Sequence, residues 1–585
     1  MLPSQSDSTL PNSQYSLPGN LNIADIIGRR YPAIRERPGG DYLVRLMELL
    51  LHQQEINQFI DKNRHLRGFA FLNQILEHFE FSYRVSDRSL KRIPSEGRVI
   101  IIANHPIGSL DGLSLLKLVR SVRSDVRIVA NELLASVEPL QQLFLPVDNM
   151  GKGAGKAAYK AMLQSLQQDE AVIIFPAGEV SRIRPNGVRD GKWKSGFLRL
   201  AQKSGAPILP VYIDAKNSLL FYSLSALYKP LGTLWLVNEM FNKKNQEITF
   251  FVGKPIAAAI VEPKSDLAKL AKQFRKHLLR LPKKGKKPLL TTFETIEHPV
   301  NRQALKKELH QSTLLGETAD GKKIYLFDYH FDSTVMQEIA RLRELTFRSV
   351  EEGTGKALDM DYYDSLYRHI VLWDENDLEI VGAYRLGEGR TLLQHHSLEG
   401  FYSHTLFELQ PEIVPKLPHA IELGRSFIQP RYWGLRGLDY LWYGIGAYLK
   451  AHPDIRYLFG PVSLSQSYPD EARQAILAFY QHQFGGQHEL ATARTPYTIH
   501  PDIKQQAEQL YQANYTTNFK QLNQLLTHYG VKVPTLYKQY SELCEPGGCS
   551  FVDFNLDANF GDCVDSLIWV EIEKVLPKKR KRYVG

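Results

Sequence analysis

Short apolar runs and amphipathic segments take turns between residues 98 and 256. Apolar runs of about four to eight residues predict buried strands, and apolar residues three and four positions apart predict helices. The expected strands are residues 98–104, 126–131, 171–175, 207–213 and 248–256, and the expected helices are residues 111–122, 155–168 and 193–204. This alternation predicts an α/β layer with a largely parallel sheet.

A second set of elements follows residue 320. Strand patterns occupy residues 322–329, 369–374, 378–386, 420–428 and 456–460, and helical patterns occupy residues 333–348, 435–451 and 470–480. Between the two sets, the sequence LPKKGKKP at residues 281–288 combines two prolines, a glycine and four lysines. Such a stretch interrupts regular structure, so we expect a domain boundary there.

These patterns divide the chain into five parts. Residues 1–20 are rich in Ser, Pro and Asn, and residues 41–60 and 65–80 have the spacing of amphipathic helices. The expected parts are a disordered N-terminus at 1–20, a first domain at 21–280, a basic linker at 281–320, a second domain at 321–505 and a C-terminal extension with a basic tail at 506–585.

Composition narrows the class of protein. Of the 585 residues, 43% are hydrophobic and 23% are charged, which is typical of globular domains and excludes wholesale disorder. The three cysteines, Cys544, Cys549 and Cys563, are too few for a disulfide scaffold and lack a standard zinc spacing. We therefore expect free thiols, no metal and a reducing compartment. The N-terminus resembles no signal peptide, and the longest apolar stretch, 219–237, is interrupted by a Lys-Pro pair, so we expect no membrane span.

The net charge of +9 is concentrated in two places. Residues 264–287 hold ten Lys or Arg against one acid, and the tail PKKRKR at residues 577–582 holds five more. An apolar stripe runs along residues 267–278, so this segment is a basic amphipathic helix that either lies on an anionic membrane or packs on its own domain. The tail could contact nucleic acid or be a solvated end, and we expect no nucleic-acid partner.

The first chemical signal is the sequence NHPIGSLDG at residues 104–112, directly after an expected strand. His105 therefore lies at the carboxyl end of a strand, where open α/β sheets bind their ligands. Asp111 follows at the start of a helix. A histidine held by an aspartate can take a proton from a hydroxyl group, although many such pairs are only structural.

A second signal, IFPAGEVSR at residues 174–182, also follows a strand. Gly178 and the turn after it could lie against a phosphate. The next loop is strongly basic, which suits an anionic headgroup or is simply a solvated surface. Its cations are Arg182, Arg184, Arg189, Lys192 and Lys194.

In this order the motifs resemble the glycerolipid (lysophospholipid) acyltransferase family, over roughly residues 40–280. The matching blocks are Asn104–Asp111, 143–148, Phe175–Ser181 and 208–213. The resemblance implies that His105 is the general base on the acceptor hydroxyl and that Asp111 orients it. It also implies that the acceptor's polar head binds at Gly178, Glu179, Ser181 and Arg182.

The match departs from the family pattern in two places. Five residues instead of four separate His105 from Asp111, an addition that Gly108 could absorb, and Ala177 replaces the family's glutamate. These variants resemble the branch of the family named for haemolysins.

The second domain contains RYWGLRG at residues 431–437, which opens a helix after a strand. Backbone N–H groups at such a turn can bind a phosphate. The turn resembles the acyl-CoA-binding turn of the GNAT N-acyltransferase superfamily. The resemblance implies that Arg431, Gly434 and Gly437 bind the acyl donor.

A further set of residues resembles the acyl-homoserine-lactone synthases and the ornithine N-acyltransferases. The set comprises Arg343, Phe347, Asp361, Asp364, Arg385, Glu422 and Arg425. The resemblance implies that Glu422 is the base or amine-positioning group, that Arg385 and Arg425 hold the strand–ligand network, and that Asp361 and Asp364 face the charged substrate. The alternative is that these residues form structural ion pairs.

Together the two resemblances imply a bifunctional ornithine-lipid synthase without a bound cofactor. The GNAT-like domain would N-acylate ornithine with a 3-hydroxyacyl group from acyl carrier protein or acyl-CoA, and the first domain would then acylate the 3-hydroxyl. Such an enzyme is expected in the cytoplasm, on anionic lipids of the bacterial inner membrane. The alternatives are a lysophospholipid acyltransferase with a non-catalytic or differently specific GNAT-like domain, and a membrane-active haemolysin.

Overall fold

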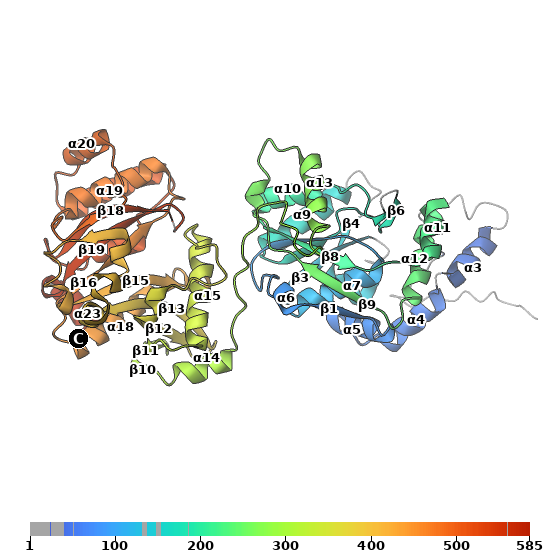
Figure 1. Cartoon of the computed structure of the whole chain (residues 1–585), viewed down its shortest axis with the longest axis horizontal. Helices are drawn as coiled ribbons and strands as arrows, with labels where there is room; N and C mark the ends of the chain where they lie inside the picture. The colour runs from blue at the N-terminus through green and yellow to red at the C-terminus, as the bar shows by residue number, and fades with distance from the viewer. Residues whose placement is uncertain are drawn as a thin grey trace, which may run out of the picture. The chain divides into compact units, whose positions relative to one another are not determined.

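The computed structural model folds into two compact units, Met1–Thr295 and Ile296–Gly585 (Figure 1). It describes residue 24 and residues 40–50, 52–131, 137–147, 154–184, 187–227, 229–558 and 560–585. The N-terminal segment 1–20, for which the sequence predicts disorder, lies outside these residues, as does Asp148 at the end of the block 143–148.

The division between the units falls inside the expected linker 281–320. Phe293 N–H donates to the Pro255 carbonyl at 3.0 Å, and Thr295 Oγ1 donates to the Arg92 carbonyl at 3.0 Å. These contacts attach residues 281–295 to the first unit, whereas helix α14 (Arg302–Leu309) belongs to the second.

The first unit is built on a seven-stranded sheet with the order β1-β9-β8-β2-β5-β3-β4. All neighbouring strands are parallel except β8 and β9, so the expected largely parallel sheet is confirmed. The strands are β1 Ser82–Val85, β2 Val99–Ala103, β3 Val126–Asn131, β4 Phe144–Val147, β5 Ala171–Ile174, β8 Ile208–Asp214 and β9 Glu247–Val252.

Helices cover both faces of this sheet, because successive strand residues point to opposite sides. Val99 and Ile101 of β2 pack with helices α5 and α7, whereas Ile100 and Ile102 pack with α9, α10 and α13. The helices are α3 Gly40–Leu50, α4 Gln53–Lys62, α5 Gly68–His78, α6 Asp87–Leu90, α7 Ser109–Arg120, α9 Ala154–Gln167, α10 Gly196–Ser204, α11 Leu219–Leu227, α12 Lys229–Phe241 and α13 Leu267–Leu278. In the described part of the chain, no helix has both the length and the apolar character to span a membrane.

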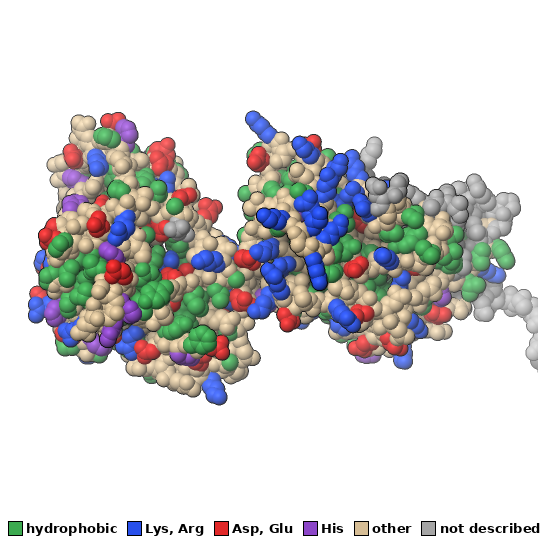
Figure 2. All heavy atoms as spheres, in the orientation of Figure 1, with side chains coloured by type: hydrophobic (Ala, Val, Ile, Leu, Met, Phe, Trp, Pro, Cys, Tyr) green, Lys and Arg blue, Asp and Glu red, His purple; other side chains and the backbone are tan. Residues whose placement is uncertain are grey.

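The basic helix α13 packs on its own unit. Leu270, Phe274 and Leu278 are 8%, 0% and 0% exposed and join the core that covers one face of the sheet. The apolar stripe is therefore not available for insertion into a membrane. Lys269 and Lys272 remain exposed on the opposite side, and Figure 2 shows Lys and Arg side chains gathered on this face of the first unit.

The second unit contains an eight-stranded sheet with the order β10-β11-β12-β13-β15-β16-β19-β18. Its strands are antiparallel except for the β15–β16 pair, which gives the expected α+β class. The strands are β10 Thr313–Glu317, β11 Lys323–Asp328, β12 Arg368–Asp374, β13 Glu379–Glu388, β15 Ala420–Ile428, β16 Tyr457–Leu464, β18 Cys549–Asp557 and β19 Cys563–Glu571.

Two cores lie on the two faces of this sheet. On β12, Ile370 and Leu372 pack with α18, whereas Val371 and Trp373 pack with α14 and α15. The longer helices are α15 Thr334–Ser349, α16 Gly389–His396, α18 Gly437–Ala451, α19 Asp470–Phe484, α20 Pro501–Leu510 and α21 Tyr515–His528.

The segment 506–585, expected as an extension, supplies part of this sheet. Strand β19 pairs with β16 along the whole length of β16, from Tyr457 opposite Glu571 to Leu464 opposite Val564. The three cysteines of this segment are buried free thiols. The basic tail forms helix α23 (Pro577–Tyr583), which is held against α18 by a 2.9 Å hydrogen bond from Tyr583 Oη to Asp439 Oδ1.

Candidate active sites

His105 lies two residues beyond the end of strand β2, and Asp111 lies in the first turn of α7. Asp111 Oδ1 is 2.9 Å from His105 Nδ1. The imidazole also stacks on the Phe175 ring, with centroids 4.1 Å apart and an angle of 24° between the planes. Because Nδ1 contacts Asp111 and the side chain is 20% exposed, Nε2 is the ring nitrogen available to an incoming group.

Asp111 is buried, and main-chain hydrogen bonds fix its carboxylate. Its Oδ2 accepts hydrogen bonds from the main-chain N–H groups of Ile107 at 2.9 Å and Gly108 at 3.3 Å. Gly108 has φ 105°, a conformation that a residue with Cβ rarely adopts. The glycine thus absorbs the extra residue between His105 and Asp111, as the sequence suggested.

The pKa of His105 is higher than that of an ordinary histidine. Burial alone would lower the pKa, but the charge and close contact of Asp111 outweigh burial, and the charge of Asp190 adds to the effect. The pair is therefore a base of increased strength at the edge of the sheet.

The loop after β5 passes directly beside His105. Ser181 N–H donates to the His105 carbonyl at 2.7 Å, so the two predicted motifs are joined through their main chains. Ser181 and Arg182 are buried, and the Arg182 guanidinium donates to Ser225 Oγ in α11. By contrast, Gly178 is exposed and Glu179 is partly exposed. Of the four residues expected to bind the acceptor head, Gly178 and Glu179 reach the surface, and Ser181 and Arg182 are buried in the loop.

Asp190 was not expected from the sequence as a site residue. Its Oδ1 accepts from Ser181 Oγ at 2.5 Å and from His105 N–H at 3.3 Å, and its Oδ2 accepts from Trp193 Nε1 at 3.0 Å. Its sequence signal was its position as one acidic residue within a loop of basic residues. Four of these cations, Arg184, Arg189, Lys192 and Lys194, are exposed as the sequence implied.

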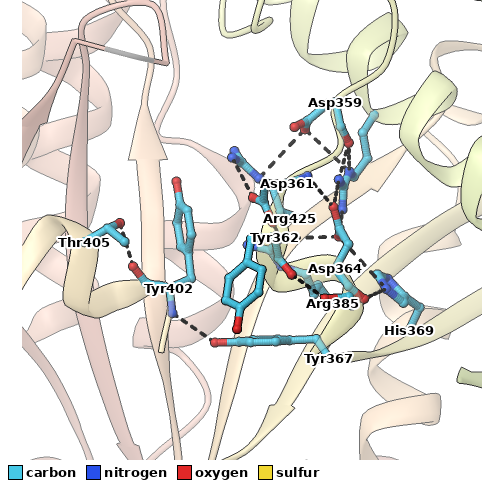
Figure 3. A network of polar contacts seen from close by, with 12 residues as sticks. Asp359, Asp361, Tyr362, Asp364, Tyr367, His369, Arg385, Tyr402, Thr405 and Arg425 are labelled. Atoms are coloured by element: carbon cyan, nitrogen blue, oxygen red, sulfur yellow. Dashed lines mark hydrogen bonds and ion pairs between the residues drawn. The ribbon is translucent and has the colours of Figure 1, made fainter. Parts of the chain in front are cut away.

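The second unit contains a buried network of arginines and aspartates (Figure 3). Arg343 on α15 binds both oxygens of Asp364, at 2.7 and 2.8 Å, and Arg385 Nη1 on β13 lies 2.7 Å from Asp361 Oδ1 and 3.3 Å from Asp364 Oδ1. Arg343 and Arg385 are each 1% exposed, and Asp364 is fully buried. Five of the six charged residues expected here are therefore brought together: Arg343, Asp361, Asp364, Arg385 and Arg425.

Arg425 enters the network from an irregularity in the sheet. The register between β13 and β15 shifts after Ala383, and Arg425 has φ 48°. Bulges of this kind redirect side chains near functional sites. The Arg425 guanidinium lies 3.6 Å from Asp361 and 4.7 Å from the centroid of the Phe560 ring. Phe347 contacts the Phe560 ring edge to face, with centroids 5.3 Å apart, so it adjoins Arg425 through this ring.

The charges of this network stabilise one another. Burial would raise the pKa of Asp364, but Arg343 and Arg385 hold that pKa far below its usual range. Burial also lowers the pKa of His369, which lies beside Asp364, to about 4. The site therefore contains fixed carboxylates and guanidinium groups and a neutral imidazole near neutral pH.

Glu422 lies on β15 and is 1% exposed. Its carboxylate accepts hydrogen bonds from the Tyr367 hydroxyl, from Ser403 N–H at 2.6 Å and from Tyr402 N–H at 3.1 Å. Burial raises its pKa, and the hydrogen bonds from Ser403 and Tyr367 oppose the shift. Glu422 thus fixes the segment that carries Tyr402, whose ring lies 5.0 Å from the Arg385 guanidinium.

Strands β15 and β16 separate immediately after Glu422. Their parallel pairing comprises only Ala420, Ile421 and Glu422 on β15, opposite residues 457–459 on β16. Along their other edges, β15 pairs with β13 and β16 pairs with β19.

The turn expected to bind the acyl donor lies at the end of β15. Gly434 has φ 77°, and α18 begins at Gly437 with no side-chain cap on its first N–H groups. Arg431 binds Asp377 at 2.6 Å and Glu379 at 2.5 Å. Uncapped N–H groups suit a phosphate, whereas Arg431 is engaged in fixing the turn.

Several residues of the second site had no signal in the sequence. Tyr367 and Tyr402 flank Arg385, and Asp359 lies 3.8 Å from Arg425. Tyrosines are common in cores, so the spacing of tyrosines along the sequence does not distinguish those that lie against a buried cation.

Comparison with protein families identifies both units. An acyltransferase model matches residues 26–283, and an acetyltransferase (GNAT) domain model matches residues 342–443.

Three relatives illustrate the similarity. The glycine N(alpha)-acyltransferase of Phocaeicola vulgatus is 31% identical over 305 residues, which are 50% of this chain and 93% of that protein. The lyso-glycine lipid O-acyltransferase of Bacteroides thetaiotaomicron is 33% identical over 223 residues, 37% of this chain and 80% of that protein. The L-ornithine N(alpha)-acyltransferase of Agrobacterium fabrum is 33% identical over 148 residues, 24% of this chain and 48% of that protein.

Proposed function

Because the chain belongs to the acyltransferases, with an acyltransferase domain followed by a GNAT domain, we propose that its two domains build one aminolipid in consecutive steps. The GNAT domain transfers a 3-hydroxyacyl group to the α-amine of an amino acid. The first domain then transfers a second acyl group to the 3-hydroxyl of that product. The observation that supports this most strongly is the pairing of a hydroxyl-directed base, His105 with Asp111, and a separate arginine–aspartate site in one chain.

In the O-acylation step, His105 Nε2 takes the proton of the acceptor hydroxyl as its oxygen attacks the thioester carbonyl. The C–S bond breaks, and the leaving thiolate takes the proton back from the imidazolium. Asp111 stabilises the imidazolium from the opposite nitrogen. An N-acylated amino acid retains its carboxylate, which suits the exposed cations Arg184, Arg189, Lys192 and Lys194 near the loop after β5.

In the N-acylation step, Arg385 and Arg425 hold the amino acid, and Glu422 positions the amine through the segment of Tyr402 and Ser403. The acyl thioester arm binds along β15 beyond Glu422, where β15 no longer pairs with β16 and main-chain groups can match the amides of the arm. The N–H groups at the start of α18 bind the phosphate of acyl carrier protein or CoA.

We propose glycine as the amino acid. The relatives named for glycine match this chain over most of their length, whereas the relative named for ornithine matches over about half of its own. Ornithine, the amino acid expected from the sequence, is favoured by one structural feature. Burial raises the pKa of Asp565 and of Glu352 to about 7, and both carboxyl groups lie in the electrostatic field of Arg425, where a cationic side chain would stabilise their charged forms.

The test is lipid mass spectrometry of a bacterial host that makes no aminolipid and expresses the full chain. Cultures receive labelled glycine or labelled ornithine. We expect a diacylated lipid that contains labelled glycine, and label from ornithine alone would select the second candidate. If neither amino acid enters a lipid, while the host's phospholipid acyl chains change, the chain is a lysophospholipid acyltransferase instead.

Glu422→Ala is the matched variant for the GNAT domain. It is expected to abolish both the mono-acylated and the diacylated lipid, because the first product is the substrate of the second step. Arg390→Ala removes an exposed ion pair of the same unit, with Asp454, and serves as the control. If haemolysis of red cells persists in Glu422→Ala and His105→Ala variants with no lipid change, the chain is a membrane-active haemolysin.

A further inference from the structure

The carboxylate of Asp190 connects the two sequence motifs of the first domain. Asp190 lies between the short strand β7 (Gly187–Arg189) and α10, and only 5% of the residue is exposed. It receives donors from three segments of the chain: the main chain after β2, the loop after β5 and the residues before α10.

These contacts close a ring of hydrogen bonds around the main chain of His105. The His105 N–H donates to Asp190, the His105 carbonyl accepts from Ser181 N–H, and the Ser181 hydroxyl donates back to Asp190. Trp193 Nε1 fixes the second oxygen of Asp190, and its indole packs in the core with Phe197. The position of His105 therefore depends on Asp111 at the ring and on Asp190 at the main chain.

No cation of the described residues forms an ion pair with the Asp190 carboxylate. Arg275 on α13 reaches the main-chain carbonyls of Asp190 and Gly191, at 3.3 and 2.7 Å, but not the carboxylate. A buried carboxylate without a cation is costly to maintain. Its two oxygens accept three hydrogen bonds, and an asparagine, with a single acceptor oxygen, would leave at least one of these donors without an acceptor.

Charged and titratable groups approach this cluster from several elements, and Glu179 and Arg184 lie beside Gly191, the residue after Asp190. Asp111 on α7 faces His105, Tyr212 on β8 lies in the field of Asp190, and Arg275 approaches from α13. Burial raises the pKa of Asp190, and the donors Ser181 and Trp193 oppose the shift. The negative charge of Asp190 in turn contributes to the raised pKa of His105.

We propose that Asp190 is a positioning residue for O-acylation, which fixes the main chain of His105 to the loop after β5 so that the base and the acceptor-binding turn move as one body. The inference rests on the proposed O-acylation step. It assigns to Asp190 a role that neither Asp111 nor the loop residues can perform, because no other carboxylate contacts both motifs among the described residues.

The experiment uses the purified full chain, a lyso-aminolipid acceptor and an acyl thioester, with rates measured from about pH 5 to about pH 9. In Asp190→Asn, we expect kcat to fall about 10-fold or more and the acid limb of the rate profile to move to lower pH, because the base loses a neighbouring negative charge. The KM for the thioester is expected to change less than about twofold. Asp87→Asn, an exposed aspartate of the same domain, is the control and is expected to match the wild-type protein.

Ser181→Ala and Trp193→Phe each remove one donor and leave the charge in place. We expect both variants to lower kcat without moving the acid limb to lower pH. A general loss of stability would not produce this difference from Asp190→Asn. A wild-type kcat and acid limb in Asp190→Asn would overturn the proposal. If Asp190→Asn does not fold, unchanged kcat in both donor variants would overturn it. A wild-type chain without O-acylation activity would refute the proposed function instead.

Discussion

The imidazole of His105 lies almost flat on the ring of Phe175, with 4.1 Å between their centroids. Phe175 is the first residue after strand β5, and His105 follows the neighbouring strand β2, so the sheet itself sets the distance between the two rings. The stacking plane and the contact with Asp111 together fix the direction of Nε2.

Phe175→Leu keeps an apolar side chain but removes the flat face. Aromatic stacking of this kind contributes about 0.5–1.5 kcal/mol, so we expect kcat/KM for O-acylation to fall roughly 3- to 10-fold. Steady-state kinetics with a lyso-lipid acceptor provide the measurement. Phe175→Tyr, which retains the ring, is the matched control, and equal losses in both variants would argue against a role for stacking.

The pH dependence of O-acylation follows from the state of His105. The imidazole must be neutral to accept a proton, and its pKa is raised mainly by Asp111 against the opposing effect of burial. The pKa of His105 thus lies above the 6.5 of an ordinary histidine, and we expect activity to fall once the pH drops below this raised pKa.

Asp111→Asn removes the charge that raises this pKa. We expect its acid limb at lower pH than that of the wild-type chain and a lower maximal rate, because the imidazolium loses its partner. An acid limb that stays in place in this variant would mean that a group other than His105 controls the profile.

Arg343 tests the buried network of the GNAT domain. Arg343→Lys cannot bind both oxygens of Asp364, and disrupting a buried ion pair costs about 3–5 kcal/mol. We expect N-acylation to be lost and the unfolding midpoint of the second unit in urea to fall. O-acylation of supplied lyso-lipid should persist, since the first unit has its own cores.

Arg390→Lys is the control for this change, because the pair of Arg390 with Asp454 is exposed on both sides. Exposed pairs contribute about 0–1 kcal/mol, so little change is expected. Equal destabilisation by the two substitutions would show that burial of Arg343 does not determine its contribution.

The exposed face of α13 provides a test of membrane association. Lys269, Lys272 and Lys276 point away from the buried stripe. A lysine near an anionic surface contributes about 1 kcal/mol, so replacing all three by Gln should weaken binding to vesicles with anionic lipid by roughly two orders of magnitude. Co-sedimentation at low and high salt measures this. If neither salt nor the substitutions weaken binding to the vesicles, the chain must bind through an apolar contact outside α13.

The sequence predicted the elements whose signals are local. The strand expected at 98–104 is β2, and the helix expected at 435–451 is α18, because each buries a face with a clear period. His105 and Asp111 were placed together correctly since they lie on one loop and the helix that follows it.

Features that depend on distant pairing were not predicted. Strand β19 joins the second sheet by pairing with β16, far earlier in the chain, and β18 pairs with β19; no local pattern encodes the partner β16. The contacts of Asp190 were missed for the same reason, because its donors come from His105, Ser181 and Trp193 on three separate segments. The burial of Ser181 and Arg182 was not predicted, since burial cannot be judged from a motif.

The most direct test of the two-step account is the lipid content of cells that express His105→Ala. The account predicts that the mono-acylated aminolipid accumulates and the diacylated lipid disappears, because the GNAT domain remains intact while the hydroxyl-directed base is absent. Continued formation of the diacylated lipid at the wild-type level would contradict it.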